Sequence, residues 1–351
     1  MEVYDSILDT IGNTPIVRLP KLNRGLKPTL LAKLEQFNPG NSVKDRIGVR
    51  MITDAEEKGL LKKGGTIVEP TSGNTGTGLA IAAAIMGYKC VFVMPDKVSQ
   101  EKISLLKAYG AEVVTTPTAV PRESPESYYN VADRLTRDIP GAFQPNQYFN
   151  PMNPRTHFET TGPEIWRQLD GKIDALVCGV GTGGTISGIG NYLKSQNPDL
   201  WVVGADPEGS IYTGDRARPY KVEGIGEDFM PGTFDSNVVD EWVMVTDRDS
   251  FDTARRITRE EGVLVGGSAG TAMWAALQVA KRMDEGKVIL TIIPDSGRGY
   301  LSKLYNDAWM RENGFLDRLP IQARVRELVH RTAREMPSLV TVPSDKTVRE
   351  A

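Results

Sequence analysis

The stretch Ala175-Leu-Val-Cys-Gly-Val-Gly-Thr-Gly-Gly-Thr185 decides the fold of this 351-residue chain. Its apolar first half predicts a buried strand, and its glycine-rich second half opens a helix that we expect to reach about Ser195. A strand that passes through a glycine loop into a helix is typical of α/β sheets, and the backbone N–H groups of such a loop can bind an anion. The stretch therefore predicts an α/β fold with a ligand loop at residues 179–185.

The same alternation of strand and helix continues on both sides of this stretch. Short β-branched runs predict strands, and the segments between them have the apolar periodicity of helices. Because strands joined by helices form βαβ units, the pattern predicts two α/β lobes, joined near residues 145–154, where proline and asparagine cluster. The predicted strands are 66–69, 90–94, 112–114, 201–205, 242–245 and 288–293, and the predicted helices include 75–86, 99–109, 250–261 and 270–283.

The composition excludes several classes of protein. The chain has 42 basic and 45 acidic side chains, a formal net charge of −3, which argues against a nucleic-acid-binding surface. A hydrophobic fraction of 40% with 25% charged residues is that of an ordinary globular protein, not of a disordered chain. The apolar region 79–94 is interrupted by glycine and lysine, and the first residues are acidic, so neither a membrane span nor a signal peptide is expected.

The cysteines and histidines indicate a reducing environment and no metal site. Cys90 and Cys178 lie in apolar runs, which predicts buried thiols in a cytoplasmic protein. The two histidines, His157 and His330, are far apart in sequence, and no cysteine–histidine spacing is that of a zinc site.

The glycine loop allows three interpretations. It satisfies the pattern G-x-G-x-x-G, and Asp206 follows Gly184 by 22 residues, as in the dinucleotide-binding fold of a nicotinamide dehydrogenase. Such an enzyme would lack an evident histidine acid and base here. The second interpretation is a loop that binds a terminal phosphate, because the hydroxyl groups of Thr182 and Thr185 suit such a phosphate better than a pyrophosphate. The third interpretation is a purely structural turn, although so many glycines cost conformational entropy.

Two further loops precede predicted helices. Thr71-Ser-Gly-Asn-Thr-Gly76 offers backbone N–H groups and hydroxyls that suit a carboxylate or a phosphate; alternatively, Ser72 or Asn74 simply caps the helix. Gly266-Gly-Ser-Ala-Gly270 matches the nucleophile pattern G-x-S-x-G, but the only downstream histidine lies in the tail. Ser268 is therefore predicted to cap a helix or to donate a hydrogen bond to a ligand.

A glycine-containing loop and one lysine complete the candidate site. Glu223-Gly-Ile-Gly-Glu227 is either an ordinary turn or a loop that closes over a site. Lys44 lies in Asn38-Pro-Gly-Asn-Ser-Val-Lys-Asp-Arg46, a turn that runs into a helix. A single lysine is usually a solvated surface charge, but beside phosphate loops Lys44 becomes a candidate for a Schiff base with an aldehyde cofactor.

Together these motifs resemble those of a known family. The segments 38–46, 69–76, 181–185 and 267–270, with Thr10-Ile-Gly-Asn-Thr-Pro-Ile-Val-Arg-Leu19 before them, are similar to the pyridoxal-phosphate-dependent family of cysteine synthases and cystathionine β-synthases. The resemblance runs from about Tyr4 to Leu316. The segments 206–210, 222–229, 294–300 and 306–316 are similar to the cystathionine β-synthase branch in particular.

The resemblance implies a two-lobed, fold-type II pyridoxal-phosphate enzyme. Each lobe would hold a mostly parallel sheet flanked by helices, with the cofactor in the cleft between the lobes. Residues 1–39 and 150–316 would form the large cofactor-binding lobe, and residues 40–149 the small mobile lobe. Residues 317–351 are expected to be a linker and the incomplete start of an adenosyl-nucleotide-binding regulatory repeat, with a helix at 324–334, a strand at 337–342 and a helix start at 344–351. Haem is not expected.

Family roles carry over to the matching positions. Lys44 would hold the cofactor through its amine and later carry the α-proton, since desolvation lowers the pKa of a lysine. Asn74 would bind the 3′-oxygen of the pyridoxal ring, and Ser268 would bind its pyridine nitrogen. The phosphate would be held by Gly181, Thr182, Gly183, Gly184 and Thr185. The substrate carboxylate would be held by Thr71, Ser72, Gly73, Thr75 and Gln147, with Tyr148, Gly226 and Glu227 near the substrate entrance.

The implied reaction is a β-replacement. L-Serine, or L-cysteine, would condense with L-homocysteine to give L-cystathionine and water, or hydrogen sulfide, in transsulfuration. The alternative within the family is a cysteine synthase that makes L-cysteine from O-acetylserine and sulfide. A non-enzymatic nucleotide-sensing protein is a further hypothesis, supported by the tail. The expected partners are small amino-acid substrates and a second copy of the chain in a homodimer, with neither nucleic acid nor membrane.

Overall fold

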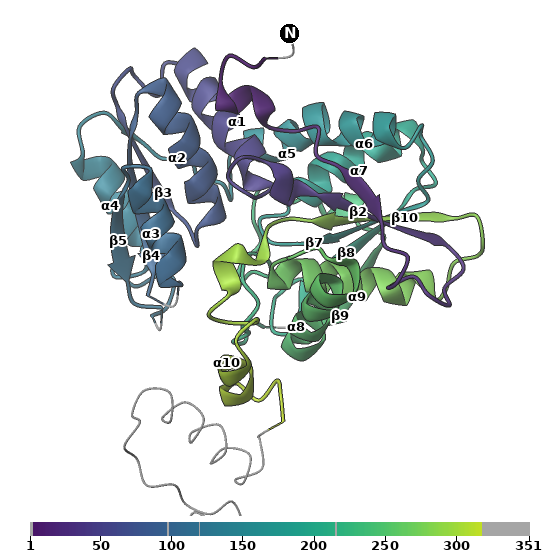
Figure 1. Ribbon diagram of the computed structural model, residues 1–351. Coiled ribbons are helices and arrows are strands. Elements are labelled where there is room, and N and C mark those ends of the chain that lie inside the picture. Colours follow the sequence, from purple (N-terminus) through teal and green to yellow (C-terminus); the bar gives the residue numbers. More distant parts are fainter. Residues whose placement is uncertain (1–2, 97, 119, 215, 318–351) are drawn as a thin grey trace, which may run out of the picture. The chain divides into compact units, whose positions relative to one another are not determined.

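The computed structural model describes residues 3–96, 98–118, 120–214 and 216–317 (Figure 1). The chain divides into two compact units, residues 1–301 and a unit that begins at Ser302 and contains helix α10 (Asp307–Glu312). The described residues of the first unit form two separate sheets and include all residues predicted for the site. The tail elements predicted at 324–334, 337–342 and 344–351 lie outside the described residues.

The larger sheet orders its strands as β1-β2-β10-β7-β8-β9. β1 runs antiparallel to β2, and the other neighbours are parallel. β2 precedes the smaller sheet in sequence, yet it pairs along its whole length with β10, from Thr29 opposite Val288 to Leu34 opposite Ile293. The chain therefore starts in this sheet, leaves it and returns. The strands are β1 (Ile16–Arg18), β2 (Thr29–Leu34), β7 (Ala175–Gly179), β8 (Trp201–Pro207), β9 (Glu241–Val245) and β10 (Val288–Ile293).

The smaller sheet orders its strands as β5-β4-β3-β6, and these neighbours are parallel. The central strands β3 and β4 are buried almost throughout, because helices cover the sheet on both faces. Burial on both faces explains their near-continuous apolar sequences. The strands are β3 (Thr66–Pro70), β4 (Lys89–Pro95), β5 (Glu112–Thr116) and β6 (Ala142–Phe143).

Helices cover both faces of each sheet. In the smaller sheet, α4 packs on one face, and α1, α2 and α3 pack on the other. Figure 1 shows α6 and α7 on one face of the larger sheet and α8 and α9 on the other. The helices are α1 (Lys44–Glu57), α2 (Asn74–Met86), α3 (Gln100–Ala108), α4 (Tyr128–Asp138), α5 (Met152–Thr156), α6 (Gly162–Gln168), α7 (Gly184–Gln196), α8 (Asp247–Arg256) and α9 (Gly267–Ala280), with short helical turns at Ile7–Thr10, Glu35–Phe37, His157–Thr161, Ser236–Val238, Ile257–Glu261 and Gly297–Tyr300.

Helices α1 and α2 cross backbone to backbone, and this crossing fixes the start of α1. A Cβ atom on Gly48 of α1 would lie 2.5 Å from the carbonyl carbon of Gly78 in α2. A Cβ atom on Gly78 would in turn lie 2.7 Å from the carbonyl oxygen of Lys44. Only glycine allows the backbones to approach so closely. Lys44, the first residue of α1, is therefore held against α2.

The sequence predicts most of these elements to within a few residues, and two differences have physical causes. The segment predicted as one helix at 250–261 starts earlier, because the Thr246 side chain caps α8, and it ends in a wider π-helical turn at Ile257–Glu261. The helix predicted at 270–283 begins at Gly267, because the glycine-containing loop itself forms the first turn of α9. The predicted α/β class with mostly parallel sheets is confirmed.

The core contains both cysteines. Cys90 and Cys178 are free and buried, which confirms the predicted buried thiols. Burial raises the pKa of both thiols, that of Cys90 to about 12. Within the described ranges, every helix is too short or too polar to span a bilayer. The same ranges contain no cluster of histidine, cysteine, aspartate and glutamate suited to a metal ion.

Candidate active site

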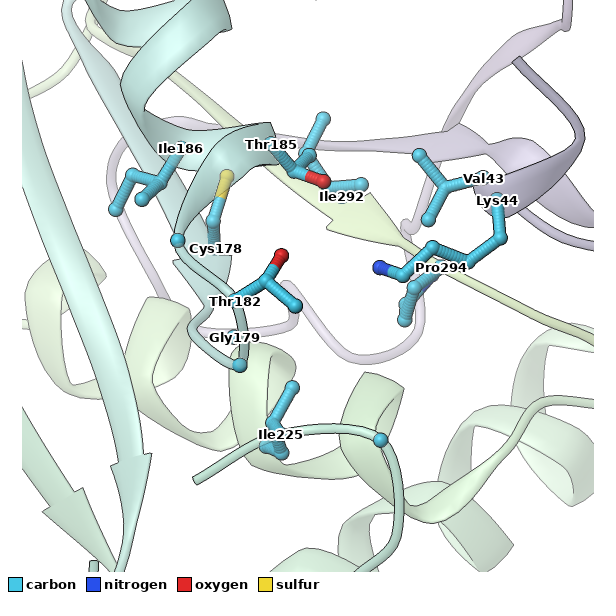
Figure 2. A pocket seen from close by; sticks show the side chains of 13 residues that line it. Val43, Lys44, Cys178, Gly179, Thr182, Thr185, Ile186, Ile225, Ile292 and Pro294 are labelled. Carbon is cyan, nitrogen blue, oxygen red and sulfur yellow. The ribbon is translucent and has the colours of Figure 1, made fainter. Parts of the chain in front are cut away.

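The glycine loop and Lys44 line the same cavity. Its volume is about 410 Å³ including its open mouth, and it lies where β7 ends and α7 begins. Figure 2 shows the Lys44 side chain reaching into the cavity from one wall, with its amine facing Thr182 on the other. Two segments about 140 residues apart in sequence thus meet in one place. The lining includes Lys44, Gly181, Thr182, Gly183, Thr185 and Gly224.

The start of α1 holds the Lys44 amine in this cavity. The N–H of Val43 donates to the carbonyl of Pro294 (2.8 Å), which joins the start of α1 to the end of β10. Among the described residues, the Lys44 amine makes no hydrogen bond or ion pair. Burial lowers the pKa of this amine, although the carboxyls of Asp295 and Glu227 oppose the effect. An amine with a lowered pKa is a better nucleophile and base near neutral pH.

The glycine loop is held from behind by side chains. The hydroxyl of Tyr212 donates to the carbonyl of Gly181 (2.7 Å), and the hydroxyl of Thr233 donates to the carbonyl of Thr182 (2.6 Å). In the part of the chain that the structure describes, no side chain caps the helix α7 that follows. Its first N–H groups are therefore left for a ligand at the positive end of the helix dipole, an arrangement that suits a phosphate.

Two residues that the sequence analysis missed support this loop. Asn153 Nδ2 donates to the hydroxyl oxygen of Thr182 (2.9 Å), and His157 Nε2 lies 3.3 Å from the hydroxyl of Thr185. Both side chains are buried, and burial with the nearby positive charges lowers the pKa of His157 well below its usual value. The imidazole is therefore neutral. The four-residue spacing of Asn153 and His157 could have indicated that both lie on one helix face. The prolines around Asn153 instead led to the prediction of a linker at this place.

The loop between β3 and α2 is closed by Thr71. The Thr71 hydroxyl accepts hydrogen bonds from the N–H groups of Gly73 (3.1 Å) and Gly76 (3.3 Å). Neither Ser72, which is exposed, nor Asn74 caps α2 with its side chain in the described structure. The alternative of simple capping by these two residues is therefore wrong. Because Thr71 satisfies the loop, Ser72 and Asn74 are left for other contacts.

Thr75 and Gln147, both expected near the substrate carboxylate, contact each other. The Thr75 hydroxyl donates to Gln147 Oε1 (2.7 Å). Glu69, near the end of β3, accepts hydrogen bonds from the N–H groups of Asn146 (2.7 Å) and Gln147 (2.9 Å). Glu69 thereby fixes the backbone that carries Gln147. Its carboxyl is fully buried, and burial raises its pKa to about 7.

Glu69→Gln is expected to remove a pH dependence of stability. A carboxyl with a raised pKa in the folded chain stabilises the fold most at low pH, and this contribution is lost as the pH rises from about 4 to about 7. The unfolding free energy of the wild type, relative to the variant, should fall by about 3–4 kcal/mol across this window. Urea unfolding at several pH values measures this difference. A difference that stays constant with pH contradicts the burial effect.

Asn74 and Ser268 are not among the residues that line the described cavity, but each lies close to residues that bear on it. Asn74 Nδ2 donates to Asp295 Oδ2 (2.8 Å). Ser268 is the second residue of α9 and is buried. A Cβ atom on Gly179, at the cavity wall, would lie 3.5 Å from the carbonyl oxygen of Ser268. The Ser268 side chain makes neither a cap bond nor another hydrogen bond to the described residues, so its predicted role as a cap is wrong.

The loop that contains Gly226 and Glu227 lies beside the glycine loop. The N–H of Gly226 donates to the carbonyl of Val180 (2.7 Å). The Glu227 carboxyl is one of two that act on the Lys44 amine. Burial and the neighbouring charge of Asp228 raise the pKa of Glu227 to about 8. These contacts favour a loop that belongs to the site over an ordinary turn.

Tyr148 lies between helix α4 and this same loop. Its hydroxyl is 3.2 Å from the hydroxyl of Tyr128, and its ring centroid is 5.3 Å from that of Phe229. Glu223, in the same loop, forms an ion pair with the Lys102 amine (2.6 Å). The side chains of Lys102 and Glu223 are 8% and 13% exposed, so the pair excludes most water.

Asp206, the acidic residue expected in a dinucleotide site, is engaged within its own loop. Its Oδ2 atom accepts hydrogen bonds from the N–H (3.0 Å) and the hydroxyl (2.7 Å) of Thr213. In a dinucleotide-binding fold the corresponding carboxylate binds a ribose hydroxyl. Because Asp206 is bonded to Thr213 instead, the structure argues against the interpretation of the chain as a nicotinamide dehydrogenase.

The donor groups of the site fit pyridoxal phosphate. The cofactor carries an aldehyde, a phosphate, a ring oxygen and a pyridine nitrogen, each of which needs a partner. Lys44 offers a free amine among the described residues, and the N-terminus of α7 offers N–H groups. Asn74 offers an amide, and Ser268 offers a buried hydroxyl. The chemistry of these groups therefore matches that of the cofactor, group by group.

Comparisons with known proteins agree with this site. The family described as "Pyridoxal-phosphate dependent enzyme" matches residues 7–295. A cystathionine beta-synthase of Dictyostelium discoideum is 49% identical over 320 residues, which cover 90% of this chain and 64% of the relative. A cysteine synthase of Staphylococcus aureus is 46% identical over 300 residues, which cover 85% and 96% of the two chains. The crystal structure of an O-acetylserine dependent cystathionine beta-synthase from Helicobacter pylori has a TM-score of 0.81 at 38% identity, covering 86% of this chain and 99% of that one.

These similarities cover the whole candidate site. The chain spans between 58% and 65% of the length of the curated cystathionine beta-synthases that it matches. The matched residues 7–295 contain Lys44, Asn74, Ser268 and both ligand loops. The similarity to solved enzymes at a TM-score of about 0.8 confirms the expected fold type. The chain belongs to the family of pyridoxal-phosphate dependent enzymes.

Proposed function

We propose that this chain is a cystathionine β-synthase of transsulfuration, which condenses L-serine, or L-cysteine, with L-homocysteine to give L-cystathionine and water, or hydrogen sulfide. The observation that carries the proposal is the Lys44 amine, which faces the glycine loop across one cavity. The proposal is supported by 49% and 50% identity to cystathionine beta-synthases over 90% of this chain.

The proposed chemistry depends on a proton taken by Lys44. Pyridoxal phosphate, when bound, withdraws electrons from the α-carbon of a joined amino acid, so that the α-proton becomes acidic and the β-substituent can leave. Lys44 would hold the cofactor and then take this proton, because its amine has a lowered pKa and reaches into the cavity. The neutral hydroxyl of Ser268 at the ring nitrogen would favour β-elimination over deeper electron withdrawal.

Three groups of residues would position the substrate and the cofactor. Asn74 would bind the ring 3′-oxygen, and Tyr148, Gly226 and Glu227 would lie at the entrance for the second substrate. The phosphate would be held by Gly181, Thr182, Gly183, Gly184 and Thr185, and the substrate carboxylate by Thr71, Ser72, Gly73, Thr75 and Gln147. The hydrogen bond between Thr75 and Gln147 supports the carboxylate site, because it holds two of these side chains together.

Closure of the two lobes would exclude water from the reacting groups. Residues 40–149 would be the small mobile lobe, and residues 1–39 and 150–316 the large one. The buried ion pair between Lys102 and Glu223 supports this closure, since it joins α3 to the loop beside the cavity. A site closed in this way protects a reactive acceptor from hydrolysis before the thiolate of homocysteine adds.

Gly184→Ala is expected to weaken cofactor binding. A Cβ atom at this position would lie 2.0 Å from Asn153 Oδ1, so Asn153 must move and lose its hydrogen bond to Thr182. We expect a cofactor Kd at least about tenfold higher, which is about 1.4 kcal/mol. Fluorescence titration of the apoenzyme with pyridoxal phosphate measures it. Ser195→Ala, at an exposed position of the same helix, is the control, and equal Kd values for the two variants would refute the role of the loop.

Turnover of alternative substrate pairs tests the proposed function. Serine with homocysteine is expected to give cystathionine with a kcat/KM at least about tenfold above that of O-acetylserine with sulfide. O-Acetylserine with homocysteine, as a third pair, separates the choice of leaving group from the choice of nucleophile. Faster formation of cysteine from O-acetylserine and sulfide would reject the proposal.

The second candidate function is that of a cysteine synthase. It is favoured by one observation, the alignment with the Staphylococcus aureus cysteine synthase over 96% of that relative's length. The same substrate pairs decide between the two functions, because sulfide has neither the ammonium nor the carboxylate of homocysteine. A pocket that recognises these groups would prefer homocysteine.

The assembly, location and tail are further parts of the proposal. A homodimer is supported by the family resemblance, and a location in the cytoplasm is supported by the two free, buried cysteines. Light scattering with size exclusion tests the dimer. Residues 317–351 would be a linker and the first part of an adenosyl-nucleotide-binding repeat, and titration with adenosine nucleotides tests that assignment. Neither nucleic acid nor membrane is a proposed partner.

A further inference from the structure

A buried carboxyl group lies beside Asn74, in the segment 294–300, to which the resemblance assigns no role in the site. Asp295 follows β10 after Pro294 and is only 3% exposed. Its Oδ2 atom accepts hydrogen bonds from Asn74 Nδ2 (2.8 Å) and from the Tyr300 hydroxyl (2.6 Å). Asn74 begins α2 on the smaller sheet, whereas Asp295 continues the larger sheet. The carboxyl therefore ties Asn74 to the other lobe.

The backbone leaves room for this carboxyl group. A Cβ atom on Gly266 would lie 2.1 Å from Asp295 Oδ1 and 2.9 Å from the ring of Tyr300. Any larger residue at position 266 would displace both side chains. Gly266 also precedes Ser268 at the start of α9, so one backbone segment serves both the carboxyl and the proposed ring-nitrogen contact.

The contacts of Asp295 continue toward the ion pair at the lobe interface. The Lys102 amine lies 4.2 Å from the centroid of the Tyr300 ring and forms the ion pair with Glu223. Burial raises the pKa of the Asp295 carboxyl, while the hydrogen bonds from Tyr300 and Asn74 and the charge of Lys102 oppose the effect. Asp295 thus lies at the centre of a network of polar side chains that runs from Asn74 through Tyr300 to Lys102.

A side-chain amide turns to present either its oxygen or its nitrogen to a ligand, unless a neighbour fixes it. We propose that Asp295 is a positioning residue for the cofactor, which fixes the carboxamide of Asn74 by accepting a hydrogen bond from one of its two N–H groups. The second N–H of the same nitrogen is then left for the ring 3′-oxygen, and Tyr300 holds Asp295 in place. This inference rests on the proposed cofactor site and is independent of the substrates.

A double-mutant cycle between Asp295 and Asn74 tests the inference. The wild type, Asp295→Ala, Asn74→Ala and the double variant are each saturated with pyridoxal phosphate, and the visible and near-ultraviolet bands of the bound cofactor are compared. An N–H donated to the ring oxygen stabilises its anionic form, which absorbs in the visible. We expect each single variant to lower the ratio of the visible to the near-ultraviolet band by about fivefold, as for the loss of one hydrogen bond. The double variant should go no further than Asn74→Ala.

Two more variants protect the test against a general loss of structure. Tyr300→Phe keeps the volume of the ring and removes one donor to Asp295, so it should move the ratio in the same direction by a smaller factor. Thr291→Val replaces a fully buried hydroxyl on β10, the strand that precedes Asp295. This hydroxyl has no hydrogen-bond partner in the described residues, so the variant should leave the ratio unchanged.

The outcomes separate the inference from the proposed site. An effect of Asn74→Ala without an effect of Asp295→Ala overturns the positioning role. Additive effects in the double variant also overturn it, because Asp295 would then act on the cofactor independently of Asn74. If Asn74→Ala itself leaves the spectrum unchanged, both the inference and the proposed contact of Asn74 fail.

Discussion

Lys44→Ala is expected to lower kcat for serine with homocysteine by at least about 10²–10⁴-fold, the range attributed to general acid–base catalysis. The loss is expected because Lys44 both holds the cofactor and takes the α-proton in the proposed mechanism. No other lysine lines the described part of the cavity. The measurement is the rate of cystathionine formation, together with the visible absorbance of the purified protein, which should shift or disappear in the variant.

The matched control for this variant lies at the end of the same helix. Lys58 follows the end of α1 and forms an exposed ion pair with Asp54 (2.8 Å). Lys58→Ala should therefore retain wild-type turnover and absorbance. Wild-type turnover in Lys44→Ala would remove Lys44 from the mechanism, whatever the effect of the control.

Arg46→Ala is expected to cause the largest loss of stability, because it breaks a buried ion network next to Lys44. Arg46 donates from Nε and Nη2 to both oxygens of Glu35 (2.7 and 2.9 Å) and from Nη1 to Glu164 (2.9 Å). Glu164 also pairs with Lys33, which is fully buried in β2. The network joins α1 to β2 and α6, and so holds the helix that carries Lys44.

Removing Arg46 leaves two carboxylates buried with too little positive charge. We expect the free energy of unfolding to fall by about 3–5 kcal/mol, as for other broken buried pairs. Arg50→Ala, which removes an exposed ion pair of the same helix with Glu159 (2.6 Å), should cost only about 0–1 kcal/mol. Urea unfolding of both variants measures the two costs. Equal losses would mean that the network does not secure α1.

The part of the site that sequence analysis predicts is the part encoded locally. A glycine loop between a strand and a helix keeps its pattern within a few residues, and so does the helix start that carries Lys44. Such patterns predict the α/β class, the main strands and the loops that meet at the cavity. The roles of Asn74, Ser268 and the other assigned residues came from the family resemblance and stay predictions.

What the sequence could not predict depends on contacts between distant segments. Charged residues such as Lys33 and Glu35 are usually expected on a solvated face of a strand. Both are fully buried here, because Glu164 pairs with Lys33 and Arg46 pairs with Glu35. Asp295 meets Asn74 across 221 residues of chain. A polar side chain in a sequence gives no sign of burial until its partner is known. The alternatives that Ser72 or Asn74 caps α2 and that Ser268 caps α9 were wrong, and at α2 the Thr71 hydroxyl accepts the loop N–H groups instead.

The central claim is that Lys44 carries pyridoxal phosphate in the cavity formed with the glycine loop. Borohydride reduces the linkage between a lysine amine and the cofactor aldehyde to a stable secondary amine, and peptide mapping by mass spectrometry then locates the modified lysine. The account predicts one pyridoxyl group per chain, on Lys44, with none on Lys102, the lysine that forms the ion pair with Glu223. A pyridoxyl group on any other lysine, or an unmodified chain after saturation with the cofactor, would contradict it.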